Sequence, residues 1–396
     1  MEQHLRCYKV PSLLTNWGAR PQAYAGHLNR SLRAAVFIYP CLTLSTLPAY
    51  LALAMNTTRL PAEWEEQDGV LLAWPHEVTD WSPYLVRARE TFARIIAEAS
   101  HHVRVLLVTD SPDSARHFLK ATTAILEQIT FLPVSCNDTW ARDFGPITII
   151  ENGRPVLLDF QFTGWGGKFK AHLDNAITQR MKEHGVFGPT HVRAIHLVLE
   201  GGSIESDGHG TLLTTSACNA NHNRNTHLSV PEIEEAFQRF LGVSRVLWLH
   251  HGYLAGDDTD SHVDMLARFA PHESIVYQAC EDSSDEHFVE LSAMADELKA
   301  FRTLAGQPYR LLALPWPSAR HDEEGNRLPV SYANFLILNS AVLVPVYGDP
   351  CDTQALTVIG KAFPGRKIIG IDCSALIFQH GSLHCLTMQL PKGVLA

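Results

Sequence analysis

From about residue 63 onward the sequence repeats one pattern, in which two strand-like runs are joined by a tight turn and helix-like runs lie between the pairs. Asn152-Gly153 gives a strong hairpin signal inside "GPITIIENGRPVLLDFQF". A second pair turns at Asp207-Gly208 in "GGSIESDGHGTLLTT". Further pairs are predicted in "HVDMLARFAPHESIVYQA" and "SYANFLILNSAVLVPVYGD". The pattern predicts an α/β protein built from similar modules.

Helical segments separate these pairs. One is predicted in "PYLVRARETFARIIAEA", followed by a buried strand at residues 102–110. Another is "PEIEEAFQRFLG", closed by Gly242 and followed by the strand "VSRVLWLHH". Polar residues recur at the module margins at intervals of roughly 50 to 70 residues: Asp143, Glu200, His262, Asn334 and Cys385. With one more module at the start, this spacing predicts a five-bladed α/β propeller of ββαβ-type modules around a shared cavity. An ordinary α/β sheet with polar loop ends is the alternative.

Composition narrows the class of partner. The chain has 396 residues and a net charge of −10, which argues against nucleic acid and suits a small cationic molecule. Its eight cysteines are scattered and form no C-x-x-C pair, which favours a reducing compartment, and we expect a cytoplasmic location.

Residues 1–54 differ from the rest of the chain. Residues 34–54 carry no charge and end in a small-residue sequence, Ala52-Leu53-Ala54, as a signal segment does. Their length would also suit a membrane anchor, which the prolines within them oppose. We favour an upstream extension before a start at Met55, with one catalytic domain at 55–396; an exported protein is the alternative, and we expect no membrane partner.

Two stretches place carboxylates beside turns. "NDTWARDFGP" (residues 137–146) contains Trp140 and Arg142, and Arg142 cannot pair usefully with both Asp138 and Asp143, which leaves a carboxylate for chemistry. A structural turn with one internal ion pair is the alternative. In "LEGGS", Glu200 follows an apolar run and precedes two glycines, where the backbone can pass close to a ligand. Taken alone, the pattern favours a plain strand end.

A third stretch, "GDDTDSHVDMLARF", is crowded with acids. If it is extended, Asp258, Asp260, His262 and Asp264 share one face. Like charges at that density repel unless a cation neutralises them, so we expect either a metal ion or a positively charged substrate there. A solvated acidic loop is the alternative.

The fourth stretch is "QHGSLHC", which ends at Cys385. No cysteine at suitable spacing supports a disulfide or a zinc site. A guanidinium carbon is a poor electrophile, and its hydrolysis benefits from a thiolate nucleophile, carboxylates that grip the nitrogens and a histidine acid/base. Cys385, the acids and His262 together suit that chemistry. His384 is not the expected partner of Cys385, because neighbours on an extended segment face opposite ways.

The chain resembles the agmatine deiminase family, which includes the bacterial type of peptidylarginine deiminase. Six ordered motifs between about residues 60 and 392 carry the resemblance: "NDTWARDFGP", "LEGGSIESDGHGTLLTT", "DDTDSHVDMLARF", "SYANFLILN", "VPVYGD" and "GSLHC". It implies a five-bladed α/β propeller and hydrolysis of agmatine to N-carbamoylputrescine and ammonia, in polyamine biosynthesis. It implies no metal or organic cofactor, and it is compatible with a homo-oligomer.

The resemblance also implies roles for individual residues. Cys385 matches the nucleophile that forms an amidino-cysteine intermediate, and His262 matches the general acid/base. Three acids match the carboxylates around the guanidinium: Asp143, Asp264 and Glu200. Trp140 and Asp258 match positions that line the substrate channel, where Trp140 would cover the methylene chain and Asp258 would read the far ammonium.

This sequence departs from the family pattern beside the catalytic positions. The cysteine loop commonly reads Gly-Gly-Gly-Asn-Ile-His-Cys, whereas His380 and Ser382 stand in it here, and Ser261 replaces a usual glycine. We expect these changes to affect loop geometry and substrate choice more than reaction type. Three rival functions remain: a peptidylarginine deiminase, a metal-dependent hydrolase using the acidic stretch with His262, and a non-catalytic guanidine-binding protein.

Overall fold

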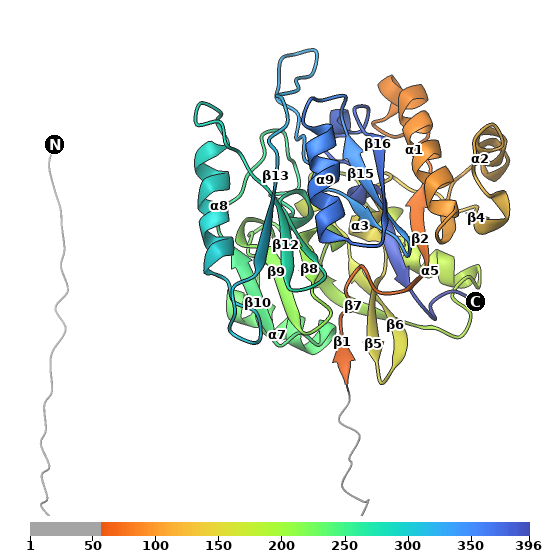
Figure 1. The fold of residues 1–396 in the computed structure, drawn as a ribbon. Helices are drawn as coiled ribbons and strands as arrows, with labels where there is room; N and C mark the ends of the chain where they lie inside the picture. The colour runs from red at the N-terminus through yellow and green to blue at the C-terminus, as the bar shows by residue number, and fades with distance from the viewer. Residues whose placement is uncertain (1–56) are drawn as a thin grey trace, which may run out of the picture. The chain divides into compact units, whose positions relative to one another are not determined.

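The structure is a computed structural model that describes residues 57–396 (Figure 1). The predicted extension at residues 1–54 lies outside the described residues. The described strands form five sheets. The first holds β1 (Thr58–Arg59), β5 (Ile147–Glu151), β6 (Arg154–Gln161) and β7 (His191–Val198); the second holds β10 (Arg245–Leu249), β9 (Thr211–Thr215) and β8 (Ile204–Ser206). The third holds β11 (Ala267–Ala270), β12 (Ser274–Gln278) and β13 (Arg310–Leu314); the fourth holds β14 (Leu336–Ile337), β15 (Ala341–Val346) and β16 (Lys367–Asp372). The fifth holds β17 (Met388–Pro391), β2 (Gln67–Ala73), β3 (Arg104–Val108) and β4 (Ile129–Leu132).

Each sheet combines an antiparallel pair with a parallel pair, and a helix connects the parallel strands. The connecting helices are α1 (Leu85–Ser100), α5 (Ile177–Glu183), α7 (Val230–Leu241), α8 (Phe288–Ala300) and α9 (Asp352–Ala362), and α2 (Pro112–Leu119) connects the further parallel pair β3 and β4. The remaining α-helices are α3 (Ala141–Phe144), α4 (Gly164–Gly167) and α6 (Ser216–Asn219). This connectivity confirms the predicted ββαβ modules. The closure of the modules into a propeller stays a prediction.

Local sequence explains the predicted elements. The hairpin between β5 and β6 turns through Asn152 and Gly153, which both have positive φ, as a two-residue turn of this kind requires. Helix α7 begins with a capping box between Ser229 and Glu232 and ends at Gly242 in the left-handed conformation. These two predictions are confirmed.

The last strand joins the two ends of the described chain. β17 pairs antiparallel with β2, with Met388 opposite Leu71. Because Cys385 lies three residues before Met388, this pairing anchors the cysteine turn against the first module. Helices then connect neighbouring sheets: α1 contacts both β3 and β16, and α9 contacts both β16 and β13 (Figure 1). Among residues 57–396, no helix has the length and apolar character needed to cross a membrane.

Candidate active site

Cys385 lies in a 3-10 turn, His384–Leu386, immediately before β17. Its side chain is buried and lines a cavity of about 230 Å³. The Sγ atom lies 3.2 Å from Asn334 Nδ2 and 3.6 Å from Asp264 Oδ2. Asn334 Oδ1 accepts the backbone N–H of His384 (2.8 Å), so the fourth module holds the turn that carries the thiol.

His262 is fully buried and faces carboxylates with both ring nitrogens. Its Nε2 lies 3.0 Å from Glu200 Oε2. Its Nδ1 lies 3.6 Å from Asp143 Oδ1 but makes no hydrogen bond within the described part of the chain. One nitrogen is therefore fixed by Glu200, and the other is available to a reacting group.

Asp143, in α3, is held by two donors. Its Oδ1 accepts the backbone N–H of Gly202 (2.9 Å), and its Oδ2 accepts the indole N–H of Trp165 (2.9 Å). A Cβ at Gly202 would lie only 2.7 Å from His262 Nδ1 and 2.8 Å from Asp143 Oδ1. Gly202 thus lets the backbone pass close to two side chains of the site, while the expected approach of this backbone to a ligand stays a prediction.

Glu200 is oriented by a guanidinium from the other side. Arg224 donates to both of its oxygens through Nε, at 2.9 and 3.1 Å, and adds a contact from Nη2 at 2.9 Å. Burial disfavours the ionised carboxylate, but His262 and Arg224 hold the pKa of Glu200 below its ordinary value. Glu200 is thus an ionised support for His262.

Asp264 presents one oxygen to protein and leaves the other free. Oδ2 lies 2.8 Å from His384 Nδ1, whereas the buried Oδ1 makes no hydrogen bond among residues 57–396. Burial opposes ionisation, yet the hydrogen bond from His384 keeps the pKa of Asp264 below its ordinary value. An ionised carboxylate with an unpartnered buried oxygen is suited to an incoming cationic N–H donor.

The charges of the site complement a cation. Burial raises the pKa of the Cys385 thiol well above its ordinary value, and Asp264 and Asp143 add to the rise. Burial lowers the pKa of His262, but Asp143 and other neighbours outweigh it and raise that pKa well above its ordinary value. Burial raises the pKa of Asp143 to about 6. A bound cation would favour the thiolate and both aspartates together.

The cavity wall contains both predicted channel residues. Trp140 and Asp258 line it, together with residues that the sequence reasoning did not select: Asp80, Asp138, Trp165, Phe169, Thr259, Gln379, His380 and Gly381. Trp140 packs so closely on the cysteine loop that a Cβ at Gly381 would lie 2.5 Å from its ring. Burial raises the pKa of Asp258 to about 6 and that of Asp138 to about 8.

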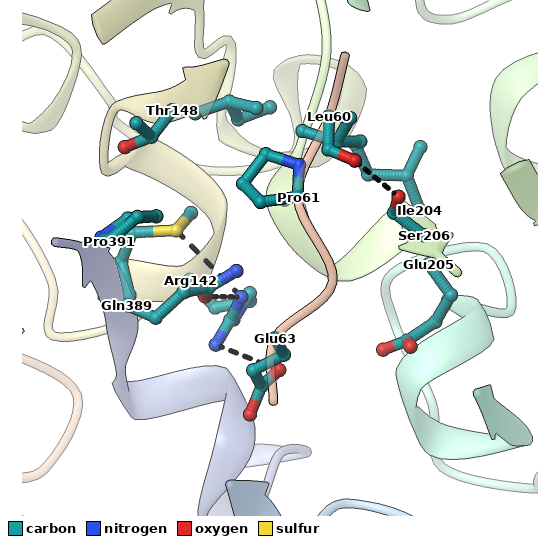
Figure 2. Close-up of a pocket in the computed structure, with 13 residues that line it drawn as sticks. Leu60, Pro61, Glu63, Arg142, Thr148, Ile204, Glu205, Ser206, Gln389 and Pro391 are labelled. Carbon is teal, nitrogen blue, oxygen red and sulfur yellow. Dashed lines mark hydrogen bonds and ion pairs between the residues drawn. The ribbon is translucent and has the colours of Figure 1, made fainter. Parts of the chain in front are cut away.

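The alternative of a structural turn with one internal ion pair is wrong, because Arg142 pairs with neither Asp138 nor Asp143 in the described part of the chain. Arg142 turns away from the cavity, where its Nη1 lies 2.5 Å from Gln389 Oε1 and its Nη2 lies 3.8 Å from Glu63 Oε2 (Figure 2). Asp138 already accepts a hydrogen bond from the backbone N–H of Thr139, and Asp143 already accepts one from the indole N–H of Trp165. Neither acid therefore needs Arg142 as a donor. The guanidinium instead lies beneath the site, in a layer of buried charges.

The extended acidic face is also wrong. Asp260 and Ser261 have positive φ, and Val263–Met265 forms a 3-10 turn, so the alternation expected of a strand is lost. Asp260 points to Lys168 (2.8 Å) and Arg224 (2.7 Å), away from Asp264. Asp260 therefore neutralises protein cations rather than a ligand.

The departures from the family pattern fall at special backbone positions. Ser261 and His380 have φ of 62° and 64°, a region that favours the glycine usual at Ser261 and in the cysteine loop. His380 Nδ1 lies 2.8 Å from Gly256 O, which ties its loop to the acidic stretch. Ser382 is buried, with its hydroxyl 3.0 Å from the Tyr347 hydroxyl.

Two buried groups have the residue types of metal ligands: Glu200, Cys218 and His262, and Glu63, Glu205 and His384. Each group also touches an arginine, Arg224 in the first and Arg268 in the second. A guanidinium at that distance already supplies the positive charge that a metal ion would bring. The set predicted for a metal, around Asp258 and Asp260, is not brought together.

Comparison with known proteins gives consistent matches over most of the chain. The model of the Porphyromonas-type peptidyl-arginine deiminase family matches residues 59–391. A Vibrio parahaemolyticus protein named "Putative agmatine deiminase" is 34% identical over 372 residues, covering 88% of this chain and 99% of that protein.

Two solved structures have similar folds. One, described as the "Putative Arginine Deiminase" from Porphyromonas gingivalis, is 48% identical with a TM-score of 0.81, and covers 86% of this chain and 100% of that one. The other is C. jejuni agmatine deiminase, in a cysteine-to-serine variant with substrate bound; it is 38% identical with a TM-score of 0.80, and covers 86% of this chain and 98% of that one.

Proposed function

Because this chain belongs to the Porphyromonas-type peptidyl-arginine deiminase family, we propose that it hydrolyses agmatine through a covalent intermediate on Cys385. One observation carries this proposal. Cys385 and Asp143 line one cavity, and two buried side chains lie just behind them: Asp264 is 3.6 Å from Cys385 Sγ, and His262 Nδ1 is 3.6 Å from Asp143 Oδ1. His262 Nδ1 and Asp264 Oδ1 make no hydrogen bond among residues 57–396. A guanidinium offers the N–H donors and the positive charge that this arrangement lacks.

Binding prepares the nucleophile. Asp143 and Asp264 accept N–H groups of the guanidinium and place its carbon beside Cys385 Sγ. At about 4 Å and an effective dielectric of about 20, a guanidinium favours the thiolate by on the order of 4 kcal/mol, part of which desolvation offsets. The raised pKa of the free thiol is thereby lowered when substrate is present, and Cys385 is activated by the molecule that it attacks.

Two half-reactions follow. Cys385 thiolate attacks the guanidinium carbon, protonated His262 gives its proton to the departing amino group, and ammonia leaves a thiouronium on sulfur. His262, now neutral, removes a proton from water, and the hydroxide attacks the same carbon. The C–S bond breaks, Cys385 leaves as thiolate, and the new C–OH group loses its proton to solvent to give the ureido product. The released ammonia takes up one proton from solvent and becomes ammonium. Guanidinium and water are converted to urea and ammonium overall.

The cavity wall supports an amine at the far end of the substrate. Asp80, Asp138 and Asp258 line it, and the ring of Trp140 is available to cover a methylene chain. An ammonium would favour the ionised forms of Asp138 and Asp258, whose pKa values burial raises. The carboxylate of free arginine would instead meet acidic side chains. Agmatine has the ammonium and lacks the carboxylate.

Arginyl compounds are the second candidate class, because the family model and the P. gingivalis structure carry those names. The test is ureido-product formation from agmatine, free arginine and an arginyl peptide, measured side by side. We expect the highest kcat/KM with agmatine. A higher kcat/KM with arginine or the peptide would reject agmatine while keeping the reaction type, and no product from any of them would reject the hydrolase.

Several broader proposals accompany this one. The product N-carbamoylputrescine would place the enzyme in putrescine biosynthesis. A cytoplasmic location is supported by the six cysteines of the described residues, which are all free thiols. A closed five-bladed propeller is supported by helices that contact two neighbouring sheets each. A small cationic partner and a homo-oligomer remain predictions.

A further inference from the structure

His384 links the site to a buried group of charges. Its Nδ1 lies 2.8 Å from Asp264 Oδ2 and its Nε2 lies 2.7 Å from Glu63 Oε2, and the side chain is almost fully buried. Ionised carboxylates only accept hydrogen bonds, so each ring nitrogen donates to the oxygen that it faces. The ring therefore joins Asp264, the acid beside Cys385 Sγ, to Glu63, an acid on the far side of the ring.

Glu63 is fixed by further donors. Arg268 Nη2 lies 2.6 Å from Glu63 Oε2, and the backbone N–H of Ile337 donates to Oε1 (2.8 Å). Arg268 Nε also contacts Glu205. Burial disfavours ionisation of Glu63, yet His384 and Arg268 keep its pKa below its ordinary value. Figure 2 shows Glu63 and Glu205 on separate segments of this layer, with Arg142 beside Glu63.

The contact from His384 fixes the orientation of the Asp264 carboxylate. His384 takes Asp264 Oδ2, and Oδ1 is left buried without a hydrogen bond among residues 57–396. An oxygen in that state is costly unless a ligand N–H reaches it. Neither His384 nor Asp264 is among the residues that line the cavity, but Asp264 lies 3.6 Å from Cys385 Sγ, which does line it. His384 would therefore act on a bound group through Asp264.

We propose that His384 is a positioning residue, which holds Asp264 by one oxygen so that the other faces the guanidinium, and that Glu63 holds His384 in turn. This inference rests on the proposed function, which supplies the guanidinium that Asp264 would bind. The 3-10 turn at His384–Leu386 makes it feasible, because the turn directs His384 into the buried charges while Cys385 lines the cavity.

Two substitutions of His384 test the roles of its two ring nitrogens separately. The amide nitrogen of His384→Asn comes near the position of Nδ1 and keeps a donor for Asp264. The amide nitrogen of His384→Gln comes near Nε2 and keeps a donor for Glu63. Both remove the imidazole, so a role in packing alone predicts similar effects. Positioning of Asp264 predicts that the Gln variant loses much more function.

The readout is the selectivity of Cys385 for a cation. The thiolate displaces chloride from 2-chloroacetamidine, a planar amidinium, and from neutral 2-chloroacetamide of the same size. The ratio of the two rates measures the cation clamp, and it does not depend on how much of a sample is folded. We expect His384→Gln to lower the ratio by about 10- to 100-fold and His384→Asn to lower it only several-fold. Values of kcat and KM for agmatine should follow the same order.

His287 supplies a matched control. It is buried, its Nδ1 lies 2.7 Å from Asp285 Oδ1, and its Nε2 accepts the backbone N–H of Ala255 (2.8 Å), but it is absent from the cavity lining. His287→Gln should lower the melting temperature and leave the ratio unchanged. Equal losses in the two His384 variants, or an unchanged ratio in His384→Gln, would overturn the proposal.

Two further measurements distinguish a failure of the positioning role of His384 from a failure of the proposed function. If the His384 variants yield no folded protein, Glu63→Asp withdraws the carboxylate from His384 by one methylene and should lower the same ratio; an unchanged ratio would overturn the inference. A wild-type enzyme with a high ratio but no agmatine turnover would reject the substrate and leave the positioning role intact.

Discussion

Removal of one indole N–H tests how the site controls its own ionisation. Trp165 donates to Asp143 Oδ2 at 2.9 Å, and both side chains are buried. Trp165→Phe keeps an aromatic ring between Phe162 and Phe169, with which Trp165 makes edge contacts. Residue 165 has positive φ, which is unfavourable for tryptophan and for phenylalanine alike, so the backbone strain should be similar in the two proteins.

The size of the effect follows from that hydrogen bond. A bond to a charged group contributes about 1.5–3 kcal/mol, and one pKa unit corresponds to about 1.4 kcal/mol. Burial raises the pKa of Asp143 to about 6, and the Trp165 N–H opposes that rise. Its loss destabilises the carboxylate, so the pKa should rise by a further unit or two, to about 7–8.

Only ionised Asp143 can clamp a guanidinium, so activity is lost as pH falls through its pKa. The acidic limb of kcat/KM against pH should therefore move upward in Trp165→Phe. At pH 7 the variant should be about 2- to 10-fold slower, and the two enzymes should converge near pH 9. The assay is ammonia release from agmatine across this range.

Trp248→Phe is the control, because Trp248 also donates to a carboxylate, Glu234 Oε1 (2.6 Å), but does not line the cavity. Its pH profile should match that of the wild type. A limb that does not move in Trp165→Phe, or that moves equally in both variants, would refute this view of Asp143.

Two further predictions concern the acids of the wall and the strained loop. Cys385→Ala should bind agmatine without turnover and should release protons on binding at pH 7, because burial raises the pKa of Asp138 to about 8 and an ammonium reverses it; calorimetry in buffers of different ionisation enthalpy measures this, and proton uptake would contradict it. Ser261→Gly should raise the urea midpoint, since removing the Cβ at φ 62° relieves about 1 kcal/mol, and a lower midpoint would show that Ser261 is not strained.

The sequence predicted what local chemistry determines. Asn152-Gly153 and Gly242 specify their turns through backbone conformation, and the hairpin and helix followed. Glu200 stood out because two glycines follow it, and the second, Gly202, leaves room for His262 and Asp143. Asn334, selected for its place in the repeat, does contact Cys385.

The residues that the sequence misplaced or missed are mostly those whose contacts come from distant segments. Arg142 lies beside Asp138 and Asp143 in sequence, yet its partners are Gln389 and Glu63, which come from distant segments. Glu63 gave no signal, because a single glutamate at the start of the globular sequence shows nothing of His384, far along the chain. Asp260 was misplaced because its left-handed φ breaks a strand-like alternation that its neighbours suggest.

The central claim is covalent catalysis by Cys385, and the most direct measurement is the mass of the enzyme quenched in acid during agmatine turnover. We expect the mass to increase by that of one agmatine less one ammonia, and we expect the added group to lie on the peptide that contains Cys385. The added mass should disappear once the substrate is exhausted. Turnover without any adduct, or an adduct on another residue such as Cys218, would contradict it.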